Sequence, residues 1–248
     1  MIDRVPAWTL AVTSMLTIQL GSAVSYPLLP VIGAGGTAWL RLTLGAIVFM
    51  LWARPPYRSW SAHELRVPVL LGVVTGLMTL SFLNAIERLP LGVAVAIEFL
   101  GPLTVAAVRA HSRRALVWPM LALVGVLLVT EPWTGSVNVS GVLYALGAGT
   151  GWGIYILLTQ KVGDRFSGID GLAVSIPVAA LSTALVGVPM AWGHVDAKVL
   201  AACLLAALLM PVIPYVCELF ALRRLTASAF GTLMALEPAF GEIGRAHV

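Results

Sequence analysis

Two apolar stretches of the chain each carry a carboxylate, and these residues have the clearest potential for chemistry. Residues 90–102 place Glu98 within an otherwise uncharged run, and residues 229–238 place Glu237 near the end of a second run. A charged side chain in hydrocarbon is costly, so a carboxylate that is retained there is usually functional or paired. The two stretches therefore predict a polar site inside a membrane-embedded protein.

Arg41 is the third charged residue expected at the same depth, about one turn into an apolar helix. Helix rise places Glu98 roughly 10 Å below the outer boundary and Glu237 roughly 16 Å above the inner boundary. A guanidinium and two carboxylates suit a zwitterionic substrate, and a carboxyl group in a low-dielectric medium can exchange protons near neutral pH. The alternatives are a structural ion pair between Arg41 and Glu98, snorkelling of Arg41, and a helix-end role for Glu237.

Further candidates for substrate contact are polar or aromatic residues inside apolar runs. Trp152 and Tyr155 could line a cavity or simply pack against other helices. Gln19, Asn84 and Thr232 could form hydrogen bonds with a substrate or with neighbouring helices. The residue types alone do not separate these alternatives.

Prolines and glycines within the apolar runs predict features of the helix backbone. Pro102, Pro214 and Pro238 each remove a backbone hydrogen bond, which predicts a gating kink or a static one. Two overlapping GxxxG patterns predict close packing of helices, because glycine lets two backbones approach. These patterns are formed by Gly147, Gly149, Gly151 and Gly153.

The remaining ionisable residues predict structure rather than chemistry. Glu218 is expected at a helix end, where pairing with Arg223 or Arg224 would fix that end. Cys203 and Cys217 fall in apolar helix without metal-ligand spacing, so we expect no metal and no cofactor. The sequence also offers no converging set of catalytic groups, so we do not expect an enzyme.

The composition predicts an all-α polytopic membrane protein. The chain has 248 residues, of which 59% are hydrophobic and 10% are charged, and its mean hydropathy is +0.96. Repeated apolar runs of this kind indicate transmembrane helices, each of about twenty residues. The expected helices are 7–29, 37–53, 67–86, 91–109, 115–130, 141–160, 171–191, 199–219 and one that begins near 226.

The distribution of basic residues predicts the orientation in the membrane. A pI near 9.4 is also typical of nucleic-acid-binding proteins, but here the basic residues gather in short loops between apolar runs, so we expect no nucleic acid. With a cytoplasmic N-terminus, only Arg88 and Lys198 lie in external loops, which agrees with the positive-inside rule. The cytoplasmic set is Arg4, Arg54, Arg58, Arg66, Arg109, Arg113, Arg114, Lys161, Arg165, Arg223 and Arg224.

The chain shows an internal repeat. Residues 85–89 resemble residues 221–225, and the same offset relates Pro102 to Pro238. The offset predicts one five-helix repeat over 1–135 and an incomplete second over 136–241, and an odd number of helices inverts the second copy. Residues 242–248 resemble the translation of a sequencing-library adapter, so we expect this tail to be non-native and the last helix to be missing.

Several stretches resemble the threonine/homoserine exporter branch of the drug/metabolite transporter superfamily, whose members carry paired EamA domains. They are residues 90–102, 151–157 and 230–238, together with Pro214-Tyr215, Glu218 and residues 221–225. The resemblance implies ten helices, about nine of them present here, in two inverted five-helix repeats. It also implies a multi-pass protein of a bacterial inner membrane.

The same resemblance implies a function. We expect export of small amino acids by proton antiport and alternating access, with Glu98 and Glu237 as the proton-coupling groups. The expected partners are the lipid bilayer, a small-molecule substrate and protons, and a homodimer stays open. The alternatives are export of another small metabolite or drug by the same fold, a membrane assembly subunit, and a membrane-embedded enzyme.

Overall fold

The structure is a computed structural model, and it describes residues 5–57, 60–109 and 138–234, with isolated positions between 109 and 138. Within these residues it contains helices and no strand, and six helical segments are long and apolar enough to cross a membrane. The first segment holds both α1 and α2. The expectation of an all-α polytopic membrane protein is confirmed. The expected helix over 115–130 and the tail over 242–248 lie outside the described part.

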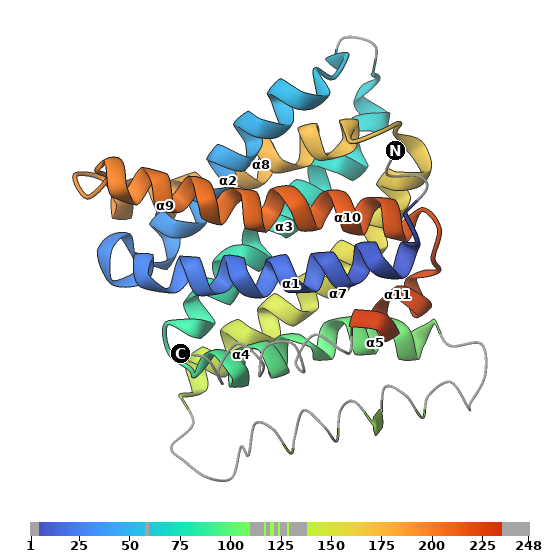
Figure 1. The fold of residues 1–248 in the computed structure, drawn as a ribbon, viewed down its shortest axis with the longest axis horizontal. Helices are drawn as coiled ribbons and strands as arrows, with labels where there is room; N and C mark the ends of the chain where they lie inside the picture. Colours follow the sequence, from blue (N-terminus) through green and yellow to red (C-terminus); the bar gives the residue numbers. More distant parts are fainter. Residues whose placement is uncertain are drawn as a thin grey trace.

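Figure 1 shows the arrangement of the helices. In chain order, the described elements are α1 (Ala7–Ser25), η2 (Tyr26–Leu28), α2 (Leu29–Ala53), α3 (Ala62–Ile86), α4 (Leu91–Glu98), α5 (Leu100–Val108), α7 (Val139–Arg165), α8 (Asp170–Ala191), α9 (Ala197–Ala207), η5 (Leu208–Val212), α10 (Ile213–Leu222) and α11 (Ala227–Met234).

Polar side chains cap three of the helices at their first turn. At α3, the Ser61 hydroxyl accepts a hydrogen bond from the backbone N–H of Glu64, and the Glu64 carboxylate accepts one from the backbone N–H of Ser61. Asn138 caps α7 and Asp196 caps α9 in the simpler way, each through its side-chain oxygen. Such caps satisfy backbone donors that have no partner within the helix.

Two expected helices are interrupted in the structure. The expected helix 91–109 divides into α4 and α5 at Phe99, because Pro102 lacks the N–H that would bond to the carbonyl of Glu98. The expected helix 199–219 divides at Met210, whose backbone is extended (φ −163°, ψ 109°), and Pro214 removes the donor for the carbonyl of that residue. Pro238, the third predicted kink, lies outside the described residues.

The first connection is tighter than expected. Helix α1 ends at Ser25, and a single 3₁₀ turn leads directly into α2. A positive φ of 67° at Gly33 then bends the start of α2, which is a conformation that favours glycine. The predicted gap between the first two helices is therefore filled by helical turns rather than by an extended loop.

Contacts with α10 show the relative directions of α1 and α7. Ser14 of α1 bonds to Glu218, and the carbonyl of Val5 accepts from Arg224. Residue numbers thus fall along α1 as they rise along α10, so the two helices are antiparallel. The ring of Tyr155 in α7 contacts the ring of Tyr215, and the carbonyl of Gly163 accepts a hydrogen bond from Arg223, so α7 runs parallel to α10. It follows that α1 and α7 run in opposite directions.

The remaining helices pack around this group. Helices α2 and α8 pack along each other, α3 contacts both α7 and α8, and α11 packs on α5 (Figure 1). The largest apolar core joins residues of α1, α2, α3, α7, α8 and α10. This arrangement places polar residues from both halves of the chain inside one bundle.

Glycines on α7 allow two neighbouring helices to approach closely. Gly149 and Gly153 lie against Gly101 and the adjoining backbone of α4 and α5. Gly147 and Gly151 face α3, at Ser81 and Met78 respectively. The two GxxxG patterns therefore serve two different neighbours, and the tighter contact is the one with Gly101.

We predict that Gly101→Ala destabilises the protein. Its added methyl carbon would lie 1.8 Å from the carbonyl oxygen of Gly149, so the two backbones would have to separate. We expect a loss of about 1–3 kcal/mol in stability, measured as a lower melting temperature in detergent. The matched control is Gly147→Ala, whose methyl carbon would lie 3.7 Å from its nearest neighbour, the Ser81 hydroxyl. Equal melting temperatures for the two variants would contradict the prediction.

Candidate functional site

A buried cavity with two carboxylates lies where α1, α3, α4, α7 and α10 meet, and we call it the acidic cavity. Its free space is about 20 Å³ when measured at the centres of water molecules, which is room for about one or two waters. The walls combine apolar side chains with carboxylate, hydroxyl and amide groups. The lining residues are Ile18, Gln19, Ser22, Met78, Phe82, Val95, Glu98, Trp152, Tyr155, Met210, Tyr215 and Glu218.

Glu98 is the last residue of α4 and lies at the interruption before α5. Its side chain is half-buried and borders the cavity. The close approach of Gly149 to the backbone of Glu98 fixes α7 against this point. The interruption thus presents a carboxylate to the cavity from the first half of the chain.

Glu218 presents the second carboxylate, from α10. Its side chain is 1% exposed, and its Oε1 atom accepts a 2.7 Å hydrogen bond from the hydroxyl of Ser14. The other oxygen, Oε2, has no hydrogen-bond partner among the described residues. The cavity therefore holds a carboxylate that is buried without a full set of hydrogen bonds.

The expected pairing of Glu218 with Arg223 or Arg224 is wrong. Arg223 donates to the carbonyls at the end of α7 and beyond it, and Arg224 donates to the carbonyl of Val5. The reason is helix geometry, because positions five and six residues on lie about 140° and 240° around the helix from Glu218. Glu218 therefore faces α1 and α7, whereas the two arginines point to other neighbours.

Aromatic side chains form one wall of the acidic cavity. The rings of Tyr155 and Tyr215 lie 5.1 Å apart between centroids, and both hydroxyls are buried without a hydrogen-bond partner among the described residues. Trp152 packs edge-on against Phe99, with centroids 5.4 Å apart. Trp152 and Tyr155 thus line the cavity, and the two tyrosine hydroxyls are free to bind a polar group.

Arg41 lies close to the cavity but does not line it. The side chain is 1% exposed, and Nη1 donates a 3.0 Å hydrogen bond to the hydroxyl of Ser25, one turn along α1 from the cavity residue Ser22. Its Nε atom has no partner among the described residues. Arg41 and Glu98 interact electrostatically, but they do not form an ion pair. The alternative of a structural ion pair between them is therefore not what the structure shows.

Other predicted site residues lie away from the cavity or outside the described part. The amide of Asn84 donates to the carbonyl of Leu80 and accepts from Arg88, so it supports the end of α3. Thr232 belongs to α11, but its side chain is outside the described part, as are Glu237 and Pro238. The structure therefore brings Glu98, Trp152 and Tyr155 together, with Gln19, and separates Asn84 from them.

Sequence reasoning missed Ser14, Ser22 and Tyr215 and misplaced Glu218. Two signals in the sequence were available. Glu218 lies four residues before the end of α10, which is about one turn inside the helix, and it follows Tyr215 by three residues. That spacing places both side chains on one face of a helix. Within the described residues, no group of three or more His, Cys, Asp and Glu side chains could hold a metal ion. The carboxylate, hydroxyl and amide groups of the cavity can take part in proton exchange, hydrogen bonding and binding of a cationic group.

Comparisons with known proteins extend these findings. The model of the EamA-like transporter family matches residues 139–243. The chain is 35% identical to the threonine/homoserine exporter RhtA of Escherichia coli (strain K12) and 34% identical to that of Salmonella typhimurium (strain LT2), and in each case the match covers 97% of this chain and 83% of the relative. One solved structure, titled as a crystal structure of a protein, has a TM-score of 0.67 over 96% of this chain and 86% of its own, at 17% identity. This last likeness shows the fold alone.

We predict that Ser14 and Glu218 are energetically coupled. Ser14→Ala leaves both carboxylate oxygens of Glu218 without a partner, which costs about 1–3 kcal/mol. In the Glu218→Leu background the same substitution removes no such bond, so a double-mutant cycle in detergent is expected to give a coupling of about 1 kcal/mol or more. Thr13→Ala is the control, because Thr13 is exposed and bonds within α1. Additive effects of the two substitutions would contradict the prediction.

Proposed function

Because the chain belongs to the EamA-like transporter family, we propose that it exports amino acids, with threonine and homoserine as substrates. It is a multi-pass membrane transporter and not an enzyme. The observation that carries the choice of substrate is the likeness to exporters of these two amino acids over nearly the whole chain. The acidic cavity supports the same choice on chemical grounds.

The cavity contains the groups that such a substrate requires. Glu98 offers a carboxylate for the substrate ammonium group, and the hydroxyls of Tyr155 and Tyr215 offer hydrogen bonds to a substrate hydroxyl. The guanidinium of Arg41, with its free Nε, suits the substrate carboxylate. Arg41 lies one turn from the cavity wall, so we propose that it reaches the substrate when the helices around Ser25 move.

The small size of the cavity supports an alternating-access mechanism. A cavity with room for about one or two waters does not hold an amino acid, so the described state is closed. The cavity borders both helix interruptions, through Glu98 at the end of α4 and through Met210. Interrupted helices at the membrane midplane form substrate sites in other transporters. We propose that Pro102 and Pro214 let these helices bend when the cavity opens.

The order of helix contacts supports two inverted repeats over 1–135 and 136–241. The offset between the two repeats relates α1 to α7, α2 to α8 and α3 to the α9–α10 segment. In agreement with a two-fold relation, α1 packs on α10 as α7 packs on α3, while α2 and α8 pack on each other. Helices α1 and α7 also run in opposite directions, and the family match over 139–243 covers nearly all of the second repeat. Such symmetry supports two equivalent openings, one to each side of the membrane.

Proton antiport is the proposed driving reaction. A carboxylate that binds either a proton or an ammonium group, but not both, exchanges one for the other across the membrane. Glu98 and Glu237 are the proposed coupling groups from the sequence. Of these two, the structure describes only Glu98, and it borders the closed cavity.

We predict that Glu98→Gln abolishes threonine transport. The purified protein in liposomes is expected to show counterflow of labelled threonine and homoserine, and loss of the carboxylate should lower the rate at least about tenfold. Glu87→Gln is the matched control, because Glu87 is exposed and pairs with Arg88 at the end of α3. Equal counterflow in Glu98→Gln and the unmodified chain would remove Glu98 from the mechanism. Absence of counterflow for both amino acids in the unmodified chain would favour another small metabolite or drug.

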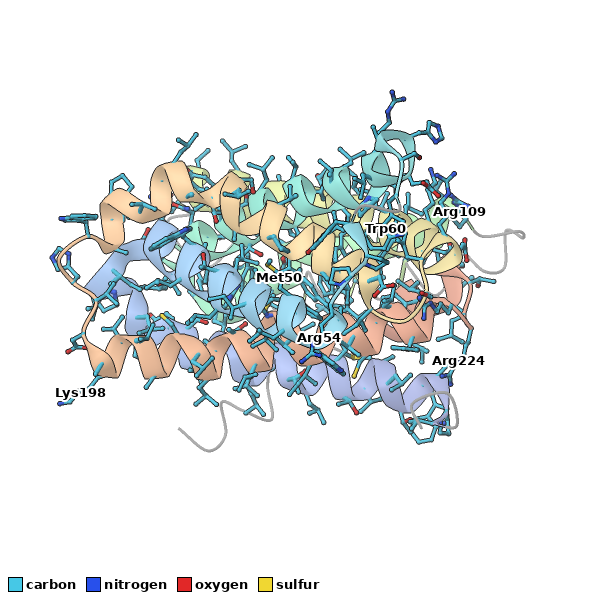
Figure 2. All side chains as sticks on the ribbon, turned by 90° about the horizontal axis from the view of Figure 1, so that it is seen from above. Met50, Arg54, Trp60, Arg109, Lys198 and Arg224 are labelled. Carbon is cyan, nitrogen blue, oxygen red and sulfur yellow. The ribbon has the colours of Figure 1, made fainter. Side chains whose placement is uncertain are left out.

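A cytoplasmic N-terminus in a bacterial inner membrane is the proposed orientation. Basic residues gather at the membrane face where α1 begins, and only Arg88 and Lys198 lie at the opposite face of the described part. Figure 2 shows Lys198 at one end of the molecule and Arg109 and Arg224 at the other. The described basic residues of the first face are Arg54, Arg66, Arg109, Lys161, Arg165, Arg223 and Arg224.

We predict that a membrane-impermeant maleimide labels Lys198→Cys in intact spheroplasts and does not label Arg66→Cys. Both positions are exposed and lie at opposite ends of the bundle. Cys203 and Cys217 are replaced by alanine first, so that only the new thiol reacts. Labelling of Arg66→Cys is expected only after the membrane is opened. Labelling of Arg66→Cys, and not Lys198→Cys, in intact spheroplasts would reverse the proposed orientation.

A further inference from the structure

We infer that Glu218 carries the coupling proton, while Glu98 binds the ammonium group of the substrate. This division of labour rests on the proposed function and changes one part of it, because it moves the coupling proton from Glu98 to Glu218. It arises from a difference between the two carboxylates of the acidic cavity. Glu98 is half-buried at a helix interruption, whereas Glu218 is 1% exposed and enclosed by α1, α7 and its own helix.

Among the described residues, the groups that surround Glu218 include no compensating cation. Helix α1 presents the hydroxyl of Ser14, α7 presents the phenol of Tyr155, and α10 itself presents Tyr215 and Cys217. Each of these groups is neutral, and the described residues of α11 include no charged side chain. An ionised carboxylate in such a place is costly unless a cation pairs with it. The site therefore favours the neutral, protonated form of Glu218.

The one buried arginine of the described bundle compensates the other carboxylate. Arg41 interacts electrostatically with Glu98 and with Tyr215, whereas the hydrogen bond of Glu218 is with the neutral hydroxyl of Ser14. Arg41 offsets part of the charge of an ionised Glu98, and the ammonium group of a bound substrate would offset the rest. Glu218 lacks this help, so a proton is the species that best neutralises it.

The hydrogen bonding of Glu218 leaves a place for that proton. Oε1 is occupied by the Ser14 hydroxyl, and Oε2 has no partner among the described residues. One proton binds to Oε2 from one side of the membrane and leaves from the same atom toward the other side, and no other bond changes. Tyr155 and Tyr215, whose hydroxyls also lack hydrogen-bond partners in the described part, line the same cavity.

Exchange of a proton for an amino acid follows from the charge of the cavity. When Glu218 is ionised, the cavity holds two carboxylates and attracts the substrate ammonium group. When Glu218 is protonated, one negative charge is gone, and the ammonium group is held less strongly. Binding of the proton on the outside therefore favours release of the substrate there, which is the direction required for export.

Liposomes that contain the purified protein allow two activities to be measured separately. One is counterflow of threonine at equal pH on both sides, and the other is accumulation of threonine driven by a pH gradient. Glu218→Gln resembles the permanently protonated form, so counterflow of labelled threonine at equal pH is expected to continue, with a higher KM, and to lose its dependence on pH. Accumulation of threonine driven by an acidic interior is expected to fall at least about tenfold, to the level without a gradient. Glu98→Gln should lose both activities, and the control Glu87→Gln should keep both. Glu218→Asp should restore part of the driven accumulation, because it retains a titratable group.

Two results would overturn the inference. Driven accumulation at the unmodified level in Glu218→Gln would show that no proton is needed at this residue. Loss of counterflow in a Glu218→Gln protein that remains monodisperse and thermally stable would place Glu218 in the substrate site or in the structural framework.

Infrared spectroscopy keeps the inference testable when the proposed substrates are wrong. If the unmodified chain shows no counterflow of either amino acid, the proposed function fails, but the protonation of Glu218 can still be measured. A protonated-carboxyl band near neutral pH that is present in Glu98→Gln and absent in Glu218→Gln would support a proton on Glu218. The same band in both variants would overturn it.

Discussion

The absence of water in the hydrocarbon core is the constraint on which the rest of this structure depends. Each polar group inside the bundle must find a partner within the protein, because lipid offers none. The protein meets this requirement for Arg41 and Glu218 with hydroxyl groups of α1, at Ser25 and Ser14. Helix α1 thus fastens α2 on one side and α10 on the other, and the acidic cavity lies between these two attachments.

Several buried polar atoms of the acidic cavity lack a hydrogen-bond partner among the described residues, and these atoms are the ones available for chemistry. A core built only for stability would leave no buried hydroxyl or carboxylate oxygen unbonded, because each costs free energy. In the described part, Oε2 of Glu218 and the hydroxyls of Tyr155 and Tyr215 are unbonded together, in one cavity. Their clustering distinguishes this region from isolated threonines elsewhere, such as Thr43. The proline-linked interruptions of α4–α5 and of the α9–α10 segment meet the same cavity, so the polar groups lie where the backbone is least regular.

The proposed symmetry of the two halves does not extend to their carboxylates. The offset that relates α1 to α7 also relates Glu98 to Met234 and Phe82 to Glu218. Each half therefore contributes one described acid to the cavity from a non-equivalent position. Only the acid from the first half has Arg41 as an electrostatic partner. Two acids in unequal surroundings can perform two different tasks, which a symmetric pair would not do.

The sequence by itself determined the helical class, most helix positions and the presence of Glu98 in a polar site, because apolar runs of membrane length and a charge within them are local signals. It also placed the tight glycine contacts of α7. It could not decide which helix faces meet, so it predicted an arginine pair for Glu218 near the helix end and left the partner of Asn84 open between substrate and neighbouring helices. Only the tertiary structure brought Ser14 to Glu218 across 204 positions of the chain. The physical reason is that a side chain's partners depend on how helices rotate and pack, and no local pattern specifies that rotation when every face of a helix is apolar.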